Sequence, residues 1–194
     1  MPAYKTIVID PPWMIVYDTG AYTNMDEFKH GIKERLPYDT MKDADIHNFD
    51  IEEYADDVCY LFMWATFGKL AGSPYLVFEL AIQLCRKWGF VVREIILWDK
   101  HNGIVSPFTP FRRQVEPIIF ATRGITQIKP YGKYSSIFRA PSTTHSTKPV
   151  YFYNWLNKWT PKPRIDIFAR NAHEGFDGWG DEYVGEGPLK EFLE

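Results

Sequence analysis

The segment Asp10-Pro11-Pro12-Trp13 places a carboxylate, a stiff turn and a large aromatic ring directly after a short apolar run. Each proline fixes φ and lacks an N–H, so the carbonyls of Asp10 and Pro11 are oriented and are not occupied by local turn bonds. The Asp10 carboxylate and the Pro11 carbonyl could therefore accept both hydrogens of one exocyclic amine. Trp13 offers a face on which an aromatic base could stack.

Two acceptors on its hydrogens would activate such an amine. The 6-amino group of adenine is a poor nucleophile, because its lone pair is delocalised into the ring. Hydrogen bonds to both hydrogens move the nitrogen toward a tetrahedral geometry. The two acceptors thus act through preorganised electrostatics and positioning rather than as a strong base. A methyl group held in line on a sulfonium could then be transferred. The alternative interpretation is a strand followed by an ordinary proline turn, with Trp13 in the core.

Apolar runs separated by Gly, Pro and polar stretches predict the elements that position this motif. Buried strands are predicted at Tyr4 to Ile9, "VCYLFMWAT" (58–66), "FVVREIILW" (90–98), "VEPIIFATRG" (115–124) and "RIDIFAR" (164–170). Helices are predicted near 25–29, after a turn within 36–49 with Thr40 as a cap, from Ser73 or Pro74 to Trp88, and in "KPVYFYNWLNKW" (148–159). Long loops are predicted at 14–37 and 124–147, and an irregular tail after Asn171.

Strands that alternate with helices predict an α/β fold, with a mostly parallel sheet and helices on both of its faces. Ligands of such sheets bind beyond the carboxyl ends of the strands, near the topological switch point. Asp10 and Arg170 each fall just past a predicted strand end. We therefore expect them to share one crevice, in a single domain spanning residues 1–194 with no separate target-recognition domain.

The composition narrows the class of protein. The chain has 194 residues, of which 45% are apolar and 17% aromatic, and a net charge of −3, so any nucleic-acid site must be a local patch. Cys59 and Cys85 lie in apolar segments, which predicts reduced core thiols and no metal site. The absence of a signal pattern and of an apolar run near 20 residues predicts a soluble cytoplasmic protein, with no membrane partner.

The Asp-Pro-Pro-Trp motif resembles that of amino-methyltransferases acting on adenine N(6). The surrounding chain resembles the branch that includes the catalytic subunit of the eukaryotic mRNA adenosine methyltransferase and small bacterial and phage DNA adenine methyltransferases. Six further segments resemble this family in its own order: "LPYDTM" (36–41), "LFMWAT" (61–66), "WGF…EIILWDK" (88–100), "EPIIFATRG" (116–124), "HSTKPVYFY" (145–153) and "RIDIFARNAHEGFDGWGDE" (164–182).

This resemblance implies a Rossmann-like fold that uses S-adenosylmethionine, permuted so that the catalytic strand precedes the cofactor strand. Lys148 would meet the methionine carboxylate of the cofactor. His145 and Ser146 would belong to a loop that closes over it. The remaining implied roles are catalytic for Asp10, Pro11, Pro12 and Trp13, and cofactor-binding for Asp10, Arg170, Asn171, Asp181 and Glu182, with the last two near the ribose hydroxyls.

A family member acting on duplex DNA would have to flip its target adenine out of the stack. Trp13, Tyr38, Arg112 and Arg113 are the candidate substrate-binding residues, with the two arginines on phosphates. DNA of a bacterial or phage system is the expected partner, and a homodimer is left open. The alternatives are an RNA adenosine methyltransferase, an inactive nucleic-acid-binding member of the family, and a Rossmann-like enzyme for a small aromatic substrate.

Overall fold

The computed structural model describes residues 3–16, 40–41, 43–71, 73–105, 110–125, 132–142, 147–180 and 183–184. Tyr38, His145, Ser146, Asp181, Glu182 and the helix predicted near 25–29 lie outside these ranges. The described elements, in chain order, are β1 (Tyr4–Ile9), β2 (Ile15–Val16), α2 (Asp43–Asn48), the 3-10 helix η1 (Ile51–Glu53), β3 (Ala55–Trp64), β4 (Lys69–Leu70), α3 (Val77–Lys87), β5 (Val91–Val105), β6 (Arg112–Arg123), β7 (Ile137–Arg139), α4 (Val150–Asn157), β8 (Arg164–Ile167) and β9 (Asp177–Trp179).

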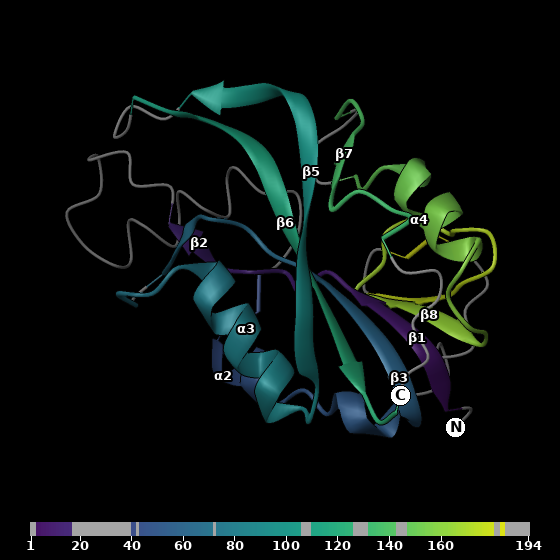
Figure 1. Ribbon diagram of the computed structural model, residues 1–194. Helices are drawn as coiled ribbons and strands as arrows, with labels where there is room; N and C mark the ends of the chain where they lie inside the picture. The colour runs from purple at the N-terminus through teal and green to yellow at the C-terminus, as the bar shows by residue number, and fades with distance from the viewer. Residues whose placement is uncertain are drawn as a thin grey trace.

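The central sheet has the strand order β7-β5-β6-β3-β1-β8-β9 (Figure 1). Its described pairs are parallel at β3-β1, β1-β8, β8-β9 and β5-β7, whereas β6 runs antiparallel to both of its neighbours. The chain leaves β1 toward β3 on one side and returns to β8 on the other. The carboxyl end of β1 is therefore a switch point, where ligands bind in open α/β sheets.

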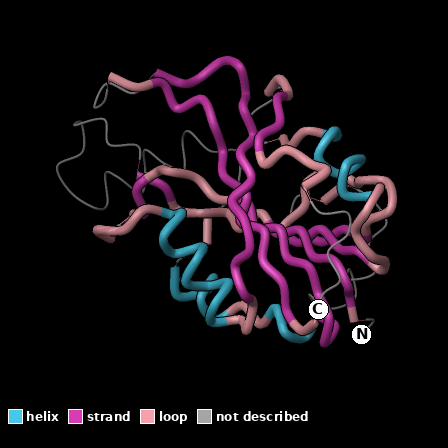
Figure 2. Tube along the Cα trace, in the orientation of Figure 1, coloured by secondary structure: helices cyan, strands magenta, loops and turns pink. Residues whose placement is uncertain are grey.

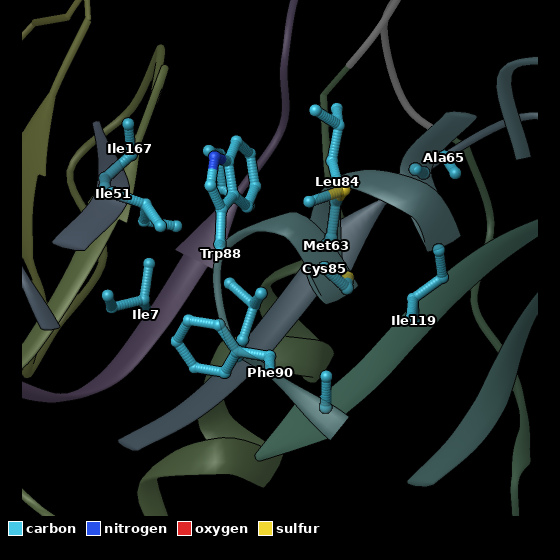
Figure 3. Close-up of a cluster of buried hydrophobic side chains, with 14 of the residues drawn as sticks. Ile7, Ile51, Met63, Ala65, Leu84, Cys85, Trp88, Phe90, Ile119 and Ile167 are labelled. Carbon is cyan, nitrogen blue, oxygen red and sulfur yellow. The ribbon is translucent and has the colours of Figure 1, made fainter. Parts of the chain in front are cut away.

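Two apolar layers cover the sheet, and the side chains of β3 divide between them. Cys59, Leu61 and Met63 belong to the core on the α3 side, whereas Phe62 and Trp64 belong to the core on the α4 side. This alternation is the period-2 pattern of a strand buried on both faces. Figure 3 shows part of the first core, where Met63 lies among residues of α3 and of neighbouring strands.

The helices lie on opposite faces of the sheet, as Figures 1 and 2 show for α2 and α3 on one side and α4 on the other. Helix α3 buries Val77, Leu80, Ala81, Leu84 and Cys85, the spacing of one apolar helical face. Helix α4 buries Phe152, Tyr153 and Leu156 against the other face. The predicted Rossmann-like fold is therefore confirmed, and β1, which leads into Asp10, precedes β8 in the chain.

Several boundaries differ from the sequence prediction. Helix α3 begins at Val77 rather than at Ser73 or Pro74, because the preceding backbone pairs instead, with the Leu70 N–H donating to the Tyr75 carbonyl. Helix α2 is described from Asp43, so Thr40 is too early to be its cap. Strand β2 lies in the predicted loop from Met14, β7 in the predicted loop 124–147 and β9 in the predicted irregular tail.

Both cysteines are buried and unbridged, which confirms their prediction as core thiols. In the part of the chain that the structure describes, no helix combines the length and apolarity needed to cross a bilayer. Within the same ranges, no cluster of three or more His, Cys, Asp or Glu residues could hold a metal ion.

Candidate active site

The turn after β1 is held by backbone hydrogen bonds on both sides. The Asp10 N–H donates to the Ile167 carbonyl at 3.2 Å, which ties the turn to the end of β8. The Met41 N–H donates to the Pro12 carbonyl at 3.0 Å, so the segment at 40–41 supports the other side. The Asp10 carboxylate therefore emerges at the switch point from a fixed backbone position.

The Pro11 carbonyl differs from its prediction, because it is engaged locally. It accepts a hydrogen bond from the Trp13 N–H at 2.8 Å. Proline removes donors at positions 11 and 12 but leaves the N–H of residue 13 free to turn back. A carbonyl oxygen has two lone pairs, so Pro11 can still accept one hydrogen of an amine.

Trp13 lies where the alternative interpretation placed it. Trp13 is 6% exposed and packs in the core on the α3 side of the sheet. The indole Nε1–H donates to the Trp64 carbonyl at 3.2 Å, which satisfies the buried donor. The predicted stacking of a base on Trp13 is not supported by this position, and the ring instead anchors the turn to β3.

Lys148, two residues before the start of α4, connects Asp10 to strand β6. Its Nζ lies 3.2 Å from Asp10 Oδ2 and 3.4 Å from Glu116 Oε2. The other carboxylate oxygen of Glu116 pairs with the ammonium of Lys100 on β5. The four side chains form an alternating row of charges, Asp10–Lys148–Glu116–Lys100, and each is 13% to 22% exposed.

Two tryptophan rings lie under this row. Lys148 Nζ is 4.7 Å from the ring centroid of Trp64, and Lys100 Nζ is 5.0 Å from that of Trp98. The two rings pack edge to face with centroids 5.8 Å apart. A cation over an indole face is attracted by the ring quadrupole, so each ammonium is held by carboxylates and by an aromatic surface.

The pKa values of the row follow from burial and charge. Burial raises the pKa of Asp10 above its ordinary value, and the charge of Lys148 offsets this only in part. Burial also acts to raise the pKa of Glu116, but Lys148 and Lys100 outweigh it, so that pKa is lowered. Burial acts against the charge of Lys148, yet Asp10 and Glu116 outweigh it and its pKa is raised. Lys148 and Glu116 are therefore charged at neutral pH.

The exit of β8 brings a second cation to this site. Arg170 follows β8, which pairs with β1 beside Asp10, and the charge of Arg170 acts to lower the pKa of Asp10. The backbone of Arg170 is fixed because its carbonyl accepts the Val184 N–H at 3.2 Å. Gly180 is required beside this exit, because a Cβ there would lie 2.4 Å from the Ala169 carbonyl oxygen. Asn171 is exposed just beyond.

The structure pairs Lys148 with Asp10, and it places the ends of β1 and β8, which precede Asp10 and Arg170, side by side in the sheet. Arg112 and Arg113 lie apart, exposed at the start of β6, before Glu116 on the same strand. Glu116 and Lys100 were given no role from the sequence. The sequence did contain a signal for each, a carboxylate inside the apolar run "VEPIIF" and a lysine two residues after the apolar run that ends at Trp98.

A second polar cluster lies on the α4 face of β8. Asp166 is 2% exposed, and its Oδ1 has no hydrogen-bond partner within the described structure. The ring of Tyr153 stacks on that of His173 with centroids 3.4 Å apart, and His173 Nε2 is 3.8 Å from Asp166 Oδ2. Burial raises the pKa of Asp166 to about 8 and lowers that of His173 to about 4. Both groups are therefore predominantly neutral at neutral pH.

The sequence profile of the MT-A70 family matches residues 4–182, a range that includes both strand ends and the charge row. The chain belongs to the MT-A70 family. This is a family of methyltransferases, and its match confirms the resemblance found in the sequence.

This MT-A70 chain is similar in sequence to three curated proteins. It is 29% identical over 192 residues to the Type II methyltransferase M.MunI of a Mycoplasma species, covering 92% of this chain and 77% of that protein. It is 26% identical over 198 residues to the N6-methyladenosine RNA methyltransferase MTA1 of Pyricularia oryzae, covering 94% of this chain and 48% of that protein. It is 31% identical over 102 residues to the N6-adenosine-methyltransferase non-catalytic subunit MTB of Arabidopsis thaliana, covering 51% of this chain and 10% of that protein.

Proposed function

We propose that this MT-A70 protein transfers the methyl group of S-adenosylmethionine to the exocyclic 6-amino group of adenine in DNA. One observation carries the proposal: the Asp10 carboxylate stands at the switch point of the sheet, 3.2 Å from the Lys148 ammonium, with the Pro11 carbonyl in the same fixed turn. The Asp10 carboxylate and the Pro11 carbonyl are two acceptors for the hydrogens of one amine. The Lys148 ammonium beside them suits the carboxylate of a bound cofactor.

The residues of the turn activate the amine by accepting its hydrogens. The Asp10 carboxylate accepts one N–H of the adenine amine, and the second lone pair of the Pro11 carbonyl oxygen accepts the other. The nitrogen then becomes more tetrahedral, so its lone pair is less delocalised into the ring. Formation of the N–C bond would break the S–C bond of the sulfonium and leave a neutral thioether, and the adenine nitrogen would become positive and more acidic. Its proton then passes to solvent, so Asp10 needs to act as an acceptor rather than as a strong base.

The donor set at the site fits S-adenosylmethionine, which supplies a methyl group on a sulfonium when bound. The methionine end of that cofactor carries a carboxylate and an ammonium, and the site offers Lys148 and Arg170 for the first and Asp10 for the second. Lys148 has three N–H donors, of which Asp10 and Glu116 use two. No other carboxylate in the described ranges takes the third, which is the proposed donor to the cofactor carboxylate. Asn171, Asp181 and Glu182 are the proposed ribose ligands.

The proposed substrate is an adenine flipped from duplex DNA in a bacterial or phage system, held by a single domain with Tyr38 among its contacts. The match to M.MunI, a Type II methyltransferase by name, over 92% of this chain supports the proposal. The second candidate is adenosine in RNA. It is favoured by the similarity to MTA1, an N6-methyladenosine RNA methyltransferase by name, over 94% of this chain.

Two measurements test this function. Isothermal titration should show one S-adenosylmethionine bound per chain, and an assay with tritiated methyl donor should show transfer to adenine-containing polymer. Parallel samples of duplex DNA, single-stranded DNA and RNA would identify the substrate. Binding without transfer to any of the three would indicate an inactive family member, and absence of binding would overturn the proposal.

A further inference from the structure

Strands β5 and β6 continue together beyond the rest of the sheet. The pairing of β6 with β3 ends at Trp64, opposite Ile118, but its pairing with β5 runs on to Val105, opposite Arg112. The extension, 99–105 with 112–116, is called the arm below. Figures 1 and 2 show it at the top of the view, away from α2 and α3. The arm projects at the carboxyl end of β3, which is the edge that also carries Asp10.

The arm grows directly out of the charge row, because Glu116 belongs to both. Arg113 and Arg112 precede Glu116 by three and four positions on β6. At about 3.3 Å per strand residue, the arginine backbones lie roughly 10 to 13 Å from Glu116, and Phe111 lies roughly 17 Å away. The arm could therefore contact a polymer while one of its nucleotides occupies the site at Asp10.

The two arginines suit a duplex because they are adjacent on one strand. Consecutive side chains on a strand point to opposite faces, so Arg112 and Arg113 extend to opposite sides of the arm. Both are exposed, and neither forms an ion pair within the described ranges. The major groove of B-DNA admits a two-stranded ribbon, and cations on such a ribbon can reach the phosphates that border the groove.

Phe111 gives the arm a stacking group next to these cations. It is 75% exposed and directly precedes Arg112. Scattered exposed apolar residues are ordinary, and Ile125 is 91% exposed elsewhere on this chain. Phe111 differs in its position, because an aromatic ring beside phosphate-binding cations can stack on bases or insert between them.

We propose that the arm binds duplex DNA beside the flipped-out adenine, with Arg112 and Arg113 contacting phosphates on its two sides and Phe111 stacking where the base has left. This inference rests on the proposed function, and it assigns a role to a residue outside the catalytic turn. A single strand has no gap to fill, so Phe111 should matter mainly on a duplex.

The first test compares one DNA preparation, free of N(6)-methyladenine, in native and heat-denatured form. Phe111→Ala should lower the native-to-denatured ratio of kcat/KM about tenfold, as expected for loss of one stacked ring. Phe111→Trp should restore the ratio. The matched control is Tyr151→Ala, a 56% exposed aromatic on α4, which should leave the ratio unchanged. An unchanged ratio for Phe111→Ala, or an equal fall in the control, would overturn the stacking role.

The second test needs no catalysis, so it separates failure of the arm from failure of the proposed function. Binding of a fluorescent duplex is measured by anisotropy across a series of salt concentrations. Arg112→Gln and Arg113→Gln should each reduce the log–log salt slope by about one. Lys158→Gln, an exposed cation after α4, should leave the slope unchanged. Unaltered slopes in both arginine variants, or slopes that change only with single-stranded DNA or RNA, would contradict duplex binding by the arm.

Discussion

Lys148 Nζ lies within 3.4 Å of two carboxylates, Asp10 at the end of β1 and Glu116 on β6. This buried ammonium joins the proposed catalytic turn to the strand that continues into the arm. Removing two charges from water is costly unless they are paired and their remaining donors are used. The alternating row Asp10–Lys148–Glu116–Lys100 meets the first condition, because each ammonium pairs with a carboxylate, and we propose that a ligand takes the third Lys148 donor.

Asp10→Asn should abolish most methyl transfer without weakening the fold. The amide replaces one acceptor oxygen with a donor, and loss of a preorganised contact of this kind lowers kcat by about 10²–10³-fold. Because burial raises the pKa of Asp10, its charged form is disfavoured in the folded protein. Stability at neutral pH should therefore stay the same or increase, as measured by urea unfolding. Ordinary activity in this variant would contradict the proposed role of Asp10.

Glu116→Gln should weaken cofactor binding, because Lys148 loses a charged partner that orients it. A charged hydrogen bond contributes about 1.5–3 kcal/mol, so KM for S-adenosylmethionine should rise about tenfold or more. The charge of Glu116 also helps to raise the pKa of Asp10. Its removal lowers that pKa, so the fall of activity on the acid side should move to lower pH. Glu94→Gln, at an exposed position on β5, is the control and should change neither quantity.

Lys148→Met should destabilise the protein at neutral pH by about 3–5 kcal/mol, because it leaves two mostly buried carboxylates without their shared cation. Chemical unfolding measures this directly. The double variant Lys148→Met/Glu116→Gln should recover part of the loss, since it contains one fewer unpaired charge. Lys158→Met removes an exposed lysine and should cost little. A Lys148→Met protein as stable as the wild type would contradict the pairing.

Asp166→Asn should become increasingly more stable than the wild type as pH rises. The pKa of Asp166 is raised to about 8 by burial, so the folded protein holds its proton while the unfolded chain releases it above about pH 4. The stability that protonated Asp166 contributes is thus present at low pH, and it is lost gradually as the pH rises to about 8. Between pH 5 and 8 the difference should grow by on the order of 4 kcal/mol. A difference that stays constant over this pH range would contradict this burial effect.

The strands that carry the site could be predicted from the sequence because each is a short apolar run, which indicates a buried strand. Strand β1 reads as an apolar run stopped by Asp10-Pro11-Pro12, and β8 reads as another. Strands β7 and β9 could not be predicted in the same way. Each has three residues with at most one fully buried, and each forms by pairing with a longer distant strand.

The contacts of the site were only partly predictable for a related reason. Lys148 and Glu116 are 32 residues apart, and nothing local in either segment identifies its partner. Trp13 fits both a stacking surface and a core position by type, and only the packing on β3 distinguishes them. The bond from the Trp13 N–H to the Pro11 carbonyl likewise depends on the turn closing on itself.

The most direct test of the central claim is mass spectrometry of nucleosides from DNA incubated with S-adenosylmethionine that carries a trideuterated methyl group. The wild type should produce adenine labelled at N(6), and Asp10→Asn should produce none above background. Label on another base or another atom, or equal label from both proteins, would contradict the assignment of Asp10 and its turn to the adenine amine.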